Sequence, residues 1–140
     1  MATEELANRL KECESIDAFL QEHRGFFDER AFQDYLERLM AGRGLNASRL
    51  ADLSGVSTPY VCNLRGGSRS APRKDMLLKL AFAMRLGVDE ANRLLALGGS
   101  APLYPKIRRE SIAIYCLNRG LPIERADEIC EGYGLEGFSV

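Results

Sequence analysis

The chain has 140 residues, of which 46% are hydrophobic and 28% charged, and its formal net charge at pH 7 is −1. This length and composition are ordinary for a globular protein with one compact core. No apolar run approaches the roughly 20 residues that a membrane helix needs, and the acidic start lacks the charged-then-apolar order of a signal peptide, so we expect a cytoplasmic protein with no membrane partner.

Residues 3–22 are amphipathic and predict one helix capped by Thr3. The apolar positions of this segment recur at intervals of three and four: Leu6, Leu10, Cys13, Ile16 and Leu20. We expect the helix to pack as an arm over the rest of the chain. The alternative is a helix that binds a protein partner or forms a dimer.

The next helix is predicted from about residue 29 to residue 41, after a short break at Phe26 and Phe27 and a cap at Asp28. Its inward-facing side is apolar and consists of Phe32, Leu36, Leu39 and Met40, with Tyr35 beside them.

Two short helices joined at Gly55 are predicted in the stretch that begins at Asn46. The Asn46 side chain can cap the first helix, and Gly55 tolerates the left-handed backbone of a tight turn. Either Ser57 or Thr58 caps the second helix, and Pro59 falls in its first turn, where a missing N–H costs little.

The second of these helices has an apolar inner side and a polar outer side. Val61 and Leu64 point inward, behind the apolar Val56 of the turn, and the polar side consists of Thr58, Tyr60 and Asn63. This is the layout of a helix-turn-helix, which places its second helix in the major groove of DNA. The alternative is an ordinary helical hairpin.

Positive charge concentrates on this stretch. Residues 43–74 carry six basic side chains and one acidic one, a net charge of +5, whereas residues 1–42 carry five basic and ten acidic ones, a net charge of −5. Phosphate contacts provide most non-specific DNA affinity, and a DNA-binding motif would need its basic residues here. The alternative is a merely solvated basic loop.

A strong core helix is predicted from Lys74 to Leu86, and Asp89 is expected to cap another that ends at Gly98. Two prolines in residues 100–105 then indicate a loop.

The last 35 residues predict a helical hairpin and a loose tail from Gly132 onward. Lys106–Asn118 contains a six-residue apolar run, which indicates burial on more than one side, and Pro122 starts the final helix. The hairpin is expected to pack against the N-terminal helix, the main domain or a second subunit. Arg108 and Arg109 could contact phosphate or form a solvated helix end.

Residues 32–99 resemble the Cro/C1-type helix-turn-helix domain of phage repressors and XRE-like bacterial regulators. The features that carry the resemblance are Leu50-Ala51, Gly55-Val56-Ser57, Val61, Leu64-Arg65-Gly66-Gly67, Pro72, Leu77, Leu80-Ala81, Leu86-Gly87-Val88 and Asp89-Glu90. The resemblance implies an all-α, five-helix domain over residues 28–99, often dimeric on palindromic DNA. Residues 1–27 would then add an N-terminal helix, and residues 100–140 a C-terminal hairpin.

The resemblance also implies which side chains meet DNA. Thr58, Tyr60 and Asn63 fall where the family contacts base edges, and asparagine can pair bidentately with adenine. The resemblance places Asn46, Arg65, Ser68, Arg69 and Arg73 at the DNA backbone or minor groove, and the positive charge of the stretch adds Arg49 and Lys74 to the expected phosphate contacts. Ala47 stands where the family often carries glutamine, and Pro59 offers no donor. Either Tyr60, Asn63 and Arg73 therefore read the bases, or this copy of the fold binds DNA weakly.

Enzyme motifs are lacking in the sequence. The pattern Gly132-x-Gly134-x-x-Gly137 matches a dinucleotide fingerprint by letters, but no strand precedes it and no helix follows it. The single histidine, His23, has no nucleophile nearby and is expected at the surface. No Cys-x-x-Cys pair occurs among the four cysteines, which are expected to be reduced and apolar: Cys13, Cys62, Cys116 and Cys130. We expect no enzyme, no cofactor and no metal site.

The sequence therefore favours a sequence-specific, double-stranded DNA-binding transcriptional regulator that acts as a homodimer. The alternative is a protein-interaction adaptor or antitoxin-like subunit on the same fold, which would hold its partner through the N- or C-terminal helices.

Overall fold

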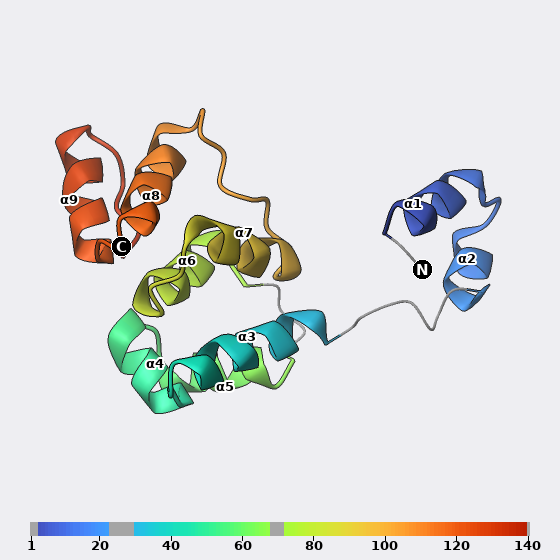
Figure 1. Ribbon diagram of the computed structural model, residues 1–140, viewed down its shortest axis with the longest axis horizontal. Coiled ribbons are helices and arrows are strands. Elements are labelled where there is room, and N and C mark those ends of the chain that lie inside the picture. Colours follow the sequence, from blue (N-terminus) through green and yellow to red (C-terminus); the bar gives the residue numbers. More distant parts are fainter. Residues whose placement is uncertain (1–2, 23–29, 68–71, 140) are drawn as a thin grey trace.

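The computed structural model describes residues 3–22, 30–67 and 72–139, and every regular element within these ranges is a helix (Figure 1). In chain order the helices are α1 (Thr3–Glu12), α2 (Ile16–Glu22), α3 (Ala31–Gly42), α4 (Ala47–Ser54), α5 (Thr58–Arg65), α6 (Lys74–Ala83), α7 (Val88–Leu97), α8 (Arg108–Asn118) and α9 (Ile123–Gly132). The predicted all-α fold is confirmed for this part of the chain. None of its helices is long and apolar enough to cross a bilayer.

The single helix predicted over residues 3–22 is wrong, because the chain breaks between α1 and α2. The Ser15 hydroxyl accepts a hydrogen bond from the backbone N–H of Ala18 at 3.3 Å, which starts a new helix. Thr3 is the first helical residue of α1 and not its cap. The break predicted at Phe26 and Phe27 and the position of His23 lie outside the described residues.

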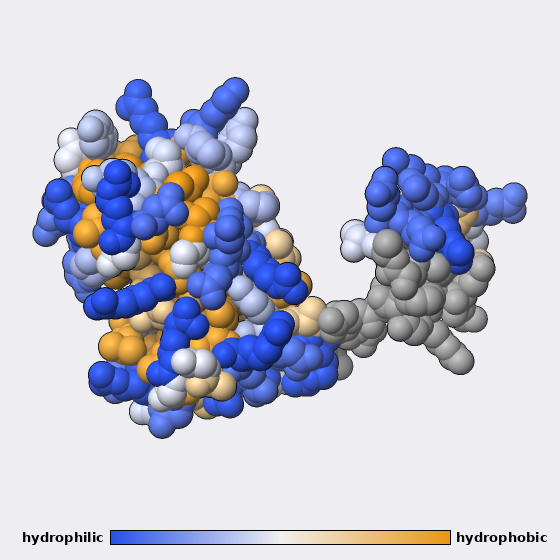
Figure 2. All heavy atoms as spheres, in the orientation of Figure 1, coloured by the Kyte–Doolittle hydropathy of each residue, from blue (hydrophilic) through white to orange (hydrophobic). Residues whose placement is uncertain are grey.

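The two N-terminal helices lie apart from α3–α9, and α1 buries none of its residues (Figure 1). This differs from the packing arm that the sequence predicted. Figure 2 shows hydrophobic surface between the charged side chains of the larger body, whereas the visible face of α1 is mostly hydrophilic.

One continuous hydrophobic core joins α3–α9. The residues of this core that are less than 2% exposed include Leu36, Leu50, Leu77, Leu94 and Cys116. Within the core α4 packs against α5 and α6, and α3 packs against α5 and α7. Truncating a fully buried leucine to alanine lowers the free energy of unfolding by about 2–5 kcal/mol. The packing of α3 and α4 on α5 therefore holds α5 in a fixed position on the body.

Two helix ends in the body differ from the sequence prediction. The helix predicted from Lys74 to Leu86 ends at Ala83, because Arg85 adopts a left-handed backbone with φ 56°. The Leu86 N–H then bonds back to the Ala81 carbonyl at 3.0 Å, which lets the Leu86 side chain be buried. Asp89 does not cap the next helix: Gly87 is the cap residue, and its N–H donates to a carboxylate oxygen of Glu90 at 3.4 Å.

The C-terminal hairpin packs on the main body, which was one of its three expected positions: α8 contacts α7, and α9 contacts α6. The apolar run on α8 is buried through Ala113, Cys116 and Leu117, whereas Tyr115 is 46% exposed. Burial raises the pKa of the Cys116 and Cys130 thiols, so both stay protonated and serve as small apolar core residues.

The prediction of a loose tail after Gly132 is wrong for residues 133–139, which the structure describes. The Phe138 side chain is fully buried, its ring centroid 6.2 Å from that of Phe82 and 4.1 Å from the guanidinium carbon of Arg109. The Phe138 N–H donates to the Asp127 carboxylate at 2.6 Å. The buried Phe138 ring therefore anchors a segment that was predicted to be a loose tail.

Candidate nucleic-acid interface

Three side-chain and backbone features set the geometry of α4 and α5, as the sequence predicted. The Asn46 side-chain oxygen accepts from the Arg49 N–H at 2.8 Å, and so caps α4. Gly55 ends α4 with φ 75°, a backbone conformation that costs glycine little. Of the two possible caps for α5 the structure uses Ser57, whose hydroxyl accepts from the Tyr60 N–H at 3.2 Å.

The buried side of α5 holds the helix against the body. Val61 and Leu64 are buried there, and Val56 is buried in the turn before them. The opposite side, which we call the exposed face of α5, consists of Thr58, Pro59, Cys62 and Asn63. Two predicted base-reading residues, Thr58 and Asn63, lie on this face.

Tyr60, the third predicted base-reading residue, lies at the edge of the exposed face and packs partly against the core. Burial raises the pKa of its phenol, and the nearby positive charge of Arg73 opposes this shift only in part. The hydroxyl is therefore neutral at physiological pH and can both donate and accept hydrogen bonds. Pro59, which the sequence places at a reading position without a hydrogen-bond donor, lies nearer the centre of the face. Cys62, which was not predicted as a reading residue, lies there too, and a helical wheel of residues 58–65 would have found it.

The predicted backbone-contacting residues fall into two groups. Arg49 and Arg73 are exposed and form no ion pair within the described ranges. Arg65 pairs with Glu37 of α3, the shortest distance between charged atoms being 3.6 Å, and its buried Nε has no hydrogen-bond partner. Asn46 is exposed, with its oxygen used in the cap. Ser68 and Arg69 lie outside the described residues.

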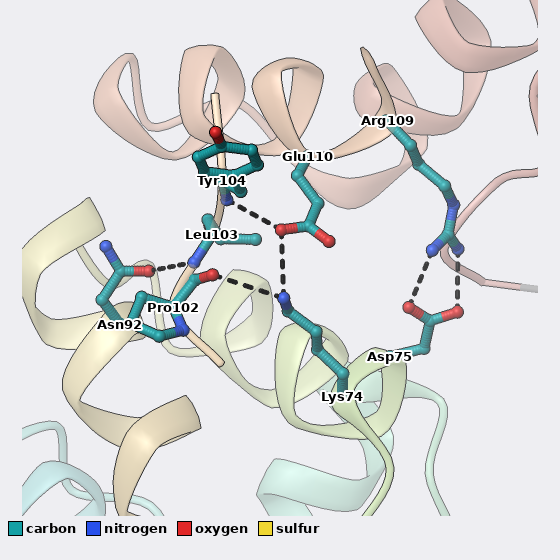
Figure 3. A network of polar contacts seen from close by, with 8 residues as sticks. All are labelled: Lys74, Asp75, Asn92, Pro102, Leu103, Tyr104, Arg109 and Glu110. Atoms are coloured by element: carbon teal, nitrogen blue, oxygen red, sulfur yellow. Dashed lines mark hydrogen bonds and ion pairs between the residues drawn. The ribbon is translucent and has the colours of Figure 1, made fainter. Parts of the chain in front are cut away.

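Lys74, a predicted phosphate contact, is held by α8 and by the loop before it. Its Nζ donates to Glu110 at 3.0 Å and to the Pro102 carbonyl at 3.4 Å (Figure 3). Arg43, which contributed to the charge of +5, is likewise occupied: its Nε donates to the Met84 carbonyl at 2.6 Å. Among the basic residues of this stretch that the structure describes, the positive charge that no internal ion pair or carbonyl occupies therefore lies on Arg49 and Arg73.

Arg109 lies beside the ion pair of Lys74 and Glu110. The sequence predicted either a phosphate contact or a solvated helix end for Arg109, but the structure shows it in internal contacts. Its guanidinium donates to both carboxylate oxygens of Asp75, at 2.9 and 2.8 Å (Figure 3). It also donates to the Glu136 and Gly137 carbonyls of the tail. The hydrogen bond to Asp75 raises the pKa of Arg109, which stays charged. The first turn of α8 thus holds the first turn of α6, directly after Arg73.

Sites of other kinds are sparse in the part of the chain that the structure describes. No group of three or more histidine, cysteine, aspartate or glutamate side chains there could hold a metal ion. A groove of about 640 Å³ lies between α8 and α9 and has no residue of α4 or α5 in its lining.

Comparisons of the chain with protein-family models, with curated proteins and with solved structures found no match. The resemblance to the Cro/C1-type domain therefore depends on the residues of this chain alone.

Proposed function

We propose that this chain is a double-stranded DNA-binding regulator of the Cro/C1 type, with α3–α7 as its five-helix domain and α5 in the major groove. One observation carries the proposal. The exposed face of α5 bears no acidic side chain, and two unpaired arginines accompany it, Arg49 on α4 and Arg73 beside Tyr60. Unpaired arginines can bind phosphate without first breaking an internal ion pair.

In this proposal residues of the exposed face contact the bases, and the two arginines beside it contact the phosphates. Asn63 pairs with an adenine through its amide, and Thr58 hydrogen-bonds to a base edge or phosphate. Pro59 and Cys62 offer apolar contact to a thymine methyl group. Arg49 and Arg73 bind phosphates and fix the register of α5 in the groove.

The first test is binding of the full chain to a pool of random duplex DNA, measured by fluorescence anisotropy over a salt series. We expect salt-dependent binding that Arg49→Ala/Arg73→Ala weakens for all sequences. The slope of log affinity against log salt should become shallower by about 1.8, since each phosphate contact contributes about 0.9. The matched control is Lys106→Ala/Arg125→Ala, which removes the same charge from exposed positions near α8 and on α9. Absence of binding at low salt, or equal losses in both variants, would contradict the proposal.

The second test concerns base recognition by Asn63. On a duplex selected from the pool, Asn63→Ala should lower the discrimination at one base pair by about 1–3 kcal/mol, because a bidentate contact is lost. Affinity for random DNA should change little. The measurement is a competition series with each base pair substituted in turn. A uniform loss of affinity at every position would show that Asn63 does not read a base.

A protein-interaction adaptor is the second candidate. It is favoured by the internal pairing of Arg65 and Lys74, which leaves fewer charges for DNA. Absence of DNA binding at low salt would favour this alternative.

A further inference from the structure

A hollow with a volume of about 180 Å³ lies where α4, α6 and the start of α9 meet. Its apolar wall includes Leu53 of α4 and Phe82 of α6. Its charged lining consists of Lys79 on α6, Arg85 in the turn after α6, and Glu124 on α9. A molecule of liquid water takes up about 30 Å³, so the hollow has room for about six waters or for one small molecule.

The two basic side chains of the hollow have no internal partner. Neither Lys79, which is half-buried, nor Arg85, which is exposed, forms an ion pair or a side-chain hydrogen bond with the described residues. Glu124 lines the same hollow but pairs with neither of them. Two positive charges against one negative charge make the hollow attractive to an anion.

Arg85 also occupies an unfavourable backbone position. Its φ is 56°, and every other described residue with a positive φ is a glycine. The turn requires this conformation, because it lets the Leu86 N–H donate to the Ala81 carbonyl at 3.0 Å. A residue with a side chain loses free energy there that glycine would not lose. Since the Arg85 guanidinium makes no internal contact that offsets this loss, its presence indicates a role outside the fold.

We propose that the hollow binds the phosphate group of a small molecule, with Arg85 and Lys79 as its two cations. A phosphate monoester carries about two negative charges at pH 7, which matches the two cations, whereas a carboxylate carries only one. Arginine can also donate two parallel hydrogen bonds to phosphate oxygens. The rest of the ligand would contact the apolar wall at Leu53 and Phe82. The inference is independent of DNA binding, because no residue of α5 lines the hollow.

Urea unfolding of the full chain at increasing ligand concentration tests the site. The probes are phenyl phosphate and inorganic phosphate, and sodium chloride at matched ionic strength is the salt control. A ligand that binds only the folded chain raises the free energy of unfolding with the logarithm of its concentration. We expect both probes to raise the urea midpoint above that of the salt control. An effect of phenyl phosphate at lower concentration would identify an ester as the ligand, and equal concentrations would identify free phosphate; both results support the phosphate site.

Variants of Arg85 separate its charge from its backbone. Arg85→Ala and Arg85→Gly should each weaken phosphate binding about tenfold or more, because a charge-assisted hydrogen bond is lost. Without phosphate, Arg85→Gly should unfold at a higher urea concentration than Arg85→Ala, since only glycine relieves the backbone. Glu124→Gln should strengthen phosphate binding by removing a repulsive charge. The control is Lys106→Ala, which removes a positive charge at an exposed position outside the hollow and should leave phosphate binding unchanged.

Four results would overturn the proposal. The first is no rise of the urea midpoint with either probe, and the second is equal phosphate affinity of Arg85→Gly and the unchanged chain. The third is an Arg85→Gly variant no more stable than Arg85→Ala, which would remove the argument from backbone strain. The fourth is a loss of affinity for random duplex DNA in Arg85→Gly, which would assign the guanidinium to the DNA backbone instead.

Discussion

Phe138→Ala is expected to lower the free energy of unfolding by about 3–5 kcal/mol, the usual cost of truncating a fully buried phenylalanine. The side chain is 0% exposed and packs between Phe82 and the Arg109 guanidinium. Its removal opens a cavity at the junction of α6, α8 and the tail. The measurement is urea unfolding followed by circular dichroism at one fixed protein concentration.

The control for this large effect is Tyr104→Ala. Tyr104 is an aromatic residue of similar size, but its side chain is 51% exposed, so the change should cost less than about 0.5 kcal/mol. If Phe138→Ala were as mild as the control, the tail would not be anchored by this side chain.

Arg109→Ala is expected to lower the free energy of unfolding by about 1.5–3 kcal/mol, the range measured for hydrogen bonds to charged groups. The residue makes a bidentate pair with Asp75, donates to two tail carbonyls and stacks on Phe138. The upper end of the range is reached only if all these contacts are lost together, because the Asp75 side chain is 43% exposed and water can replace part of the pairing. Urea unfolding provides the value.

Two further variants make the Arg109 result specific. Arg109→Lys should recover less than half of the loss, because an ammonium group can neither grip both carboxylate oxygens nor stack on the Phe138 ring. Arg125→Ala breaks an exposed pair with Glu128 and should cost no more than about 0.5 kcal/mol. Full rescue by lysine would mean that charge alone, and not the fork geometry, holds the tail.

Sequence predicted the parts of the fold that depend on neighbours along the chain. The caps at Asn46 and Gly55 were found because each acts within four residues of its own position. The break before α2 was not predicted, because the three- and four-residue spacing of apolar side chains continues across it. Periodicity alone could not reveal that Ser15 starts a second helix.

Contacts between distant segments could not be predicted. A count of charges placed Lys74 with the DNA-contacting residues, but its partner Glu110 comes 36 positions later. The segment after Gly132 was predicted to be a loose tail, and only the position of Phe82 in space explains why the Phe138 ring is buried. Arg49 and Arg73 remain predicted DNA contacts, and the structure adds that they are unpaired in the described ranges.

Two neighbouring residues at the start of α6, Lys74 and Asp75, are bound by two neighbouring residues at the start of α8, Glu110 and Arg109. These two adjacent ion pairs affect the order in which parts of the chain unfold. Detaching the C-terminal hairpin breaks both pairs at once and frees the first turn of α6, which is next to Arg73. We therefore expect the hairpin and the first turn of α6 to open together, in one cooperative step. By contrast, α1 buries none of its residues and can fray without disturbing either.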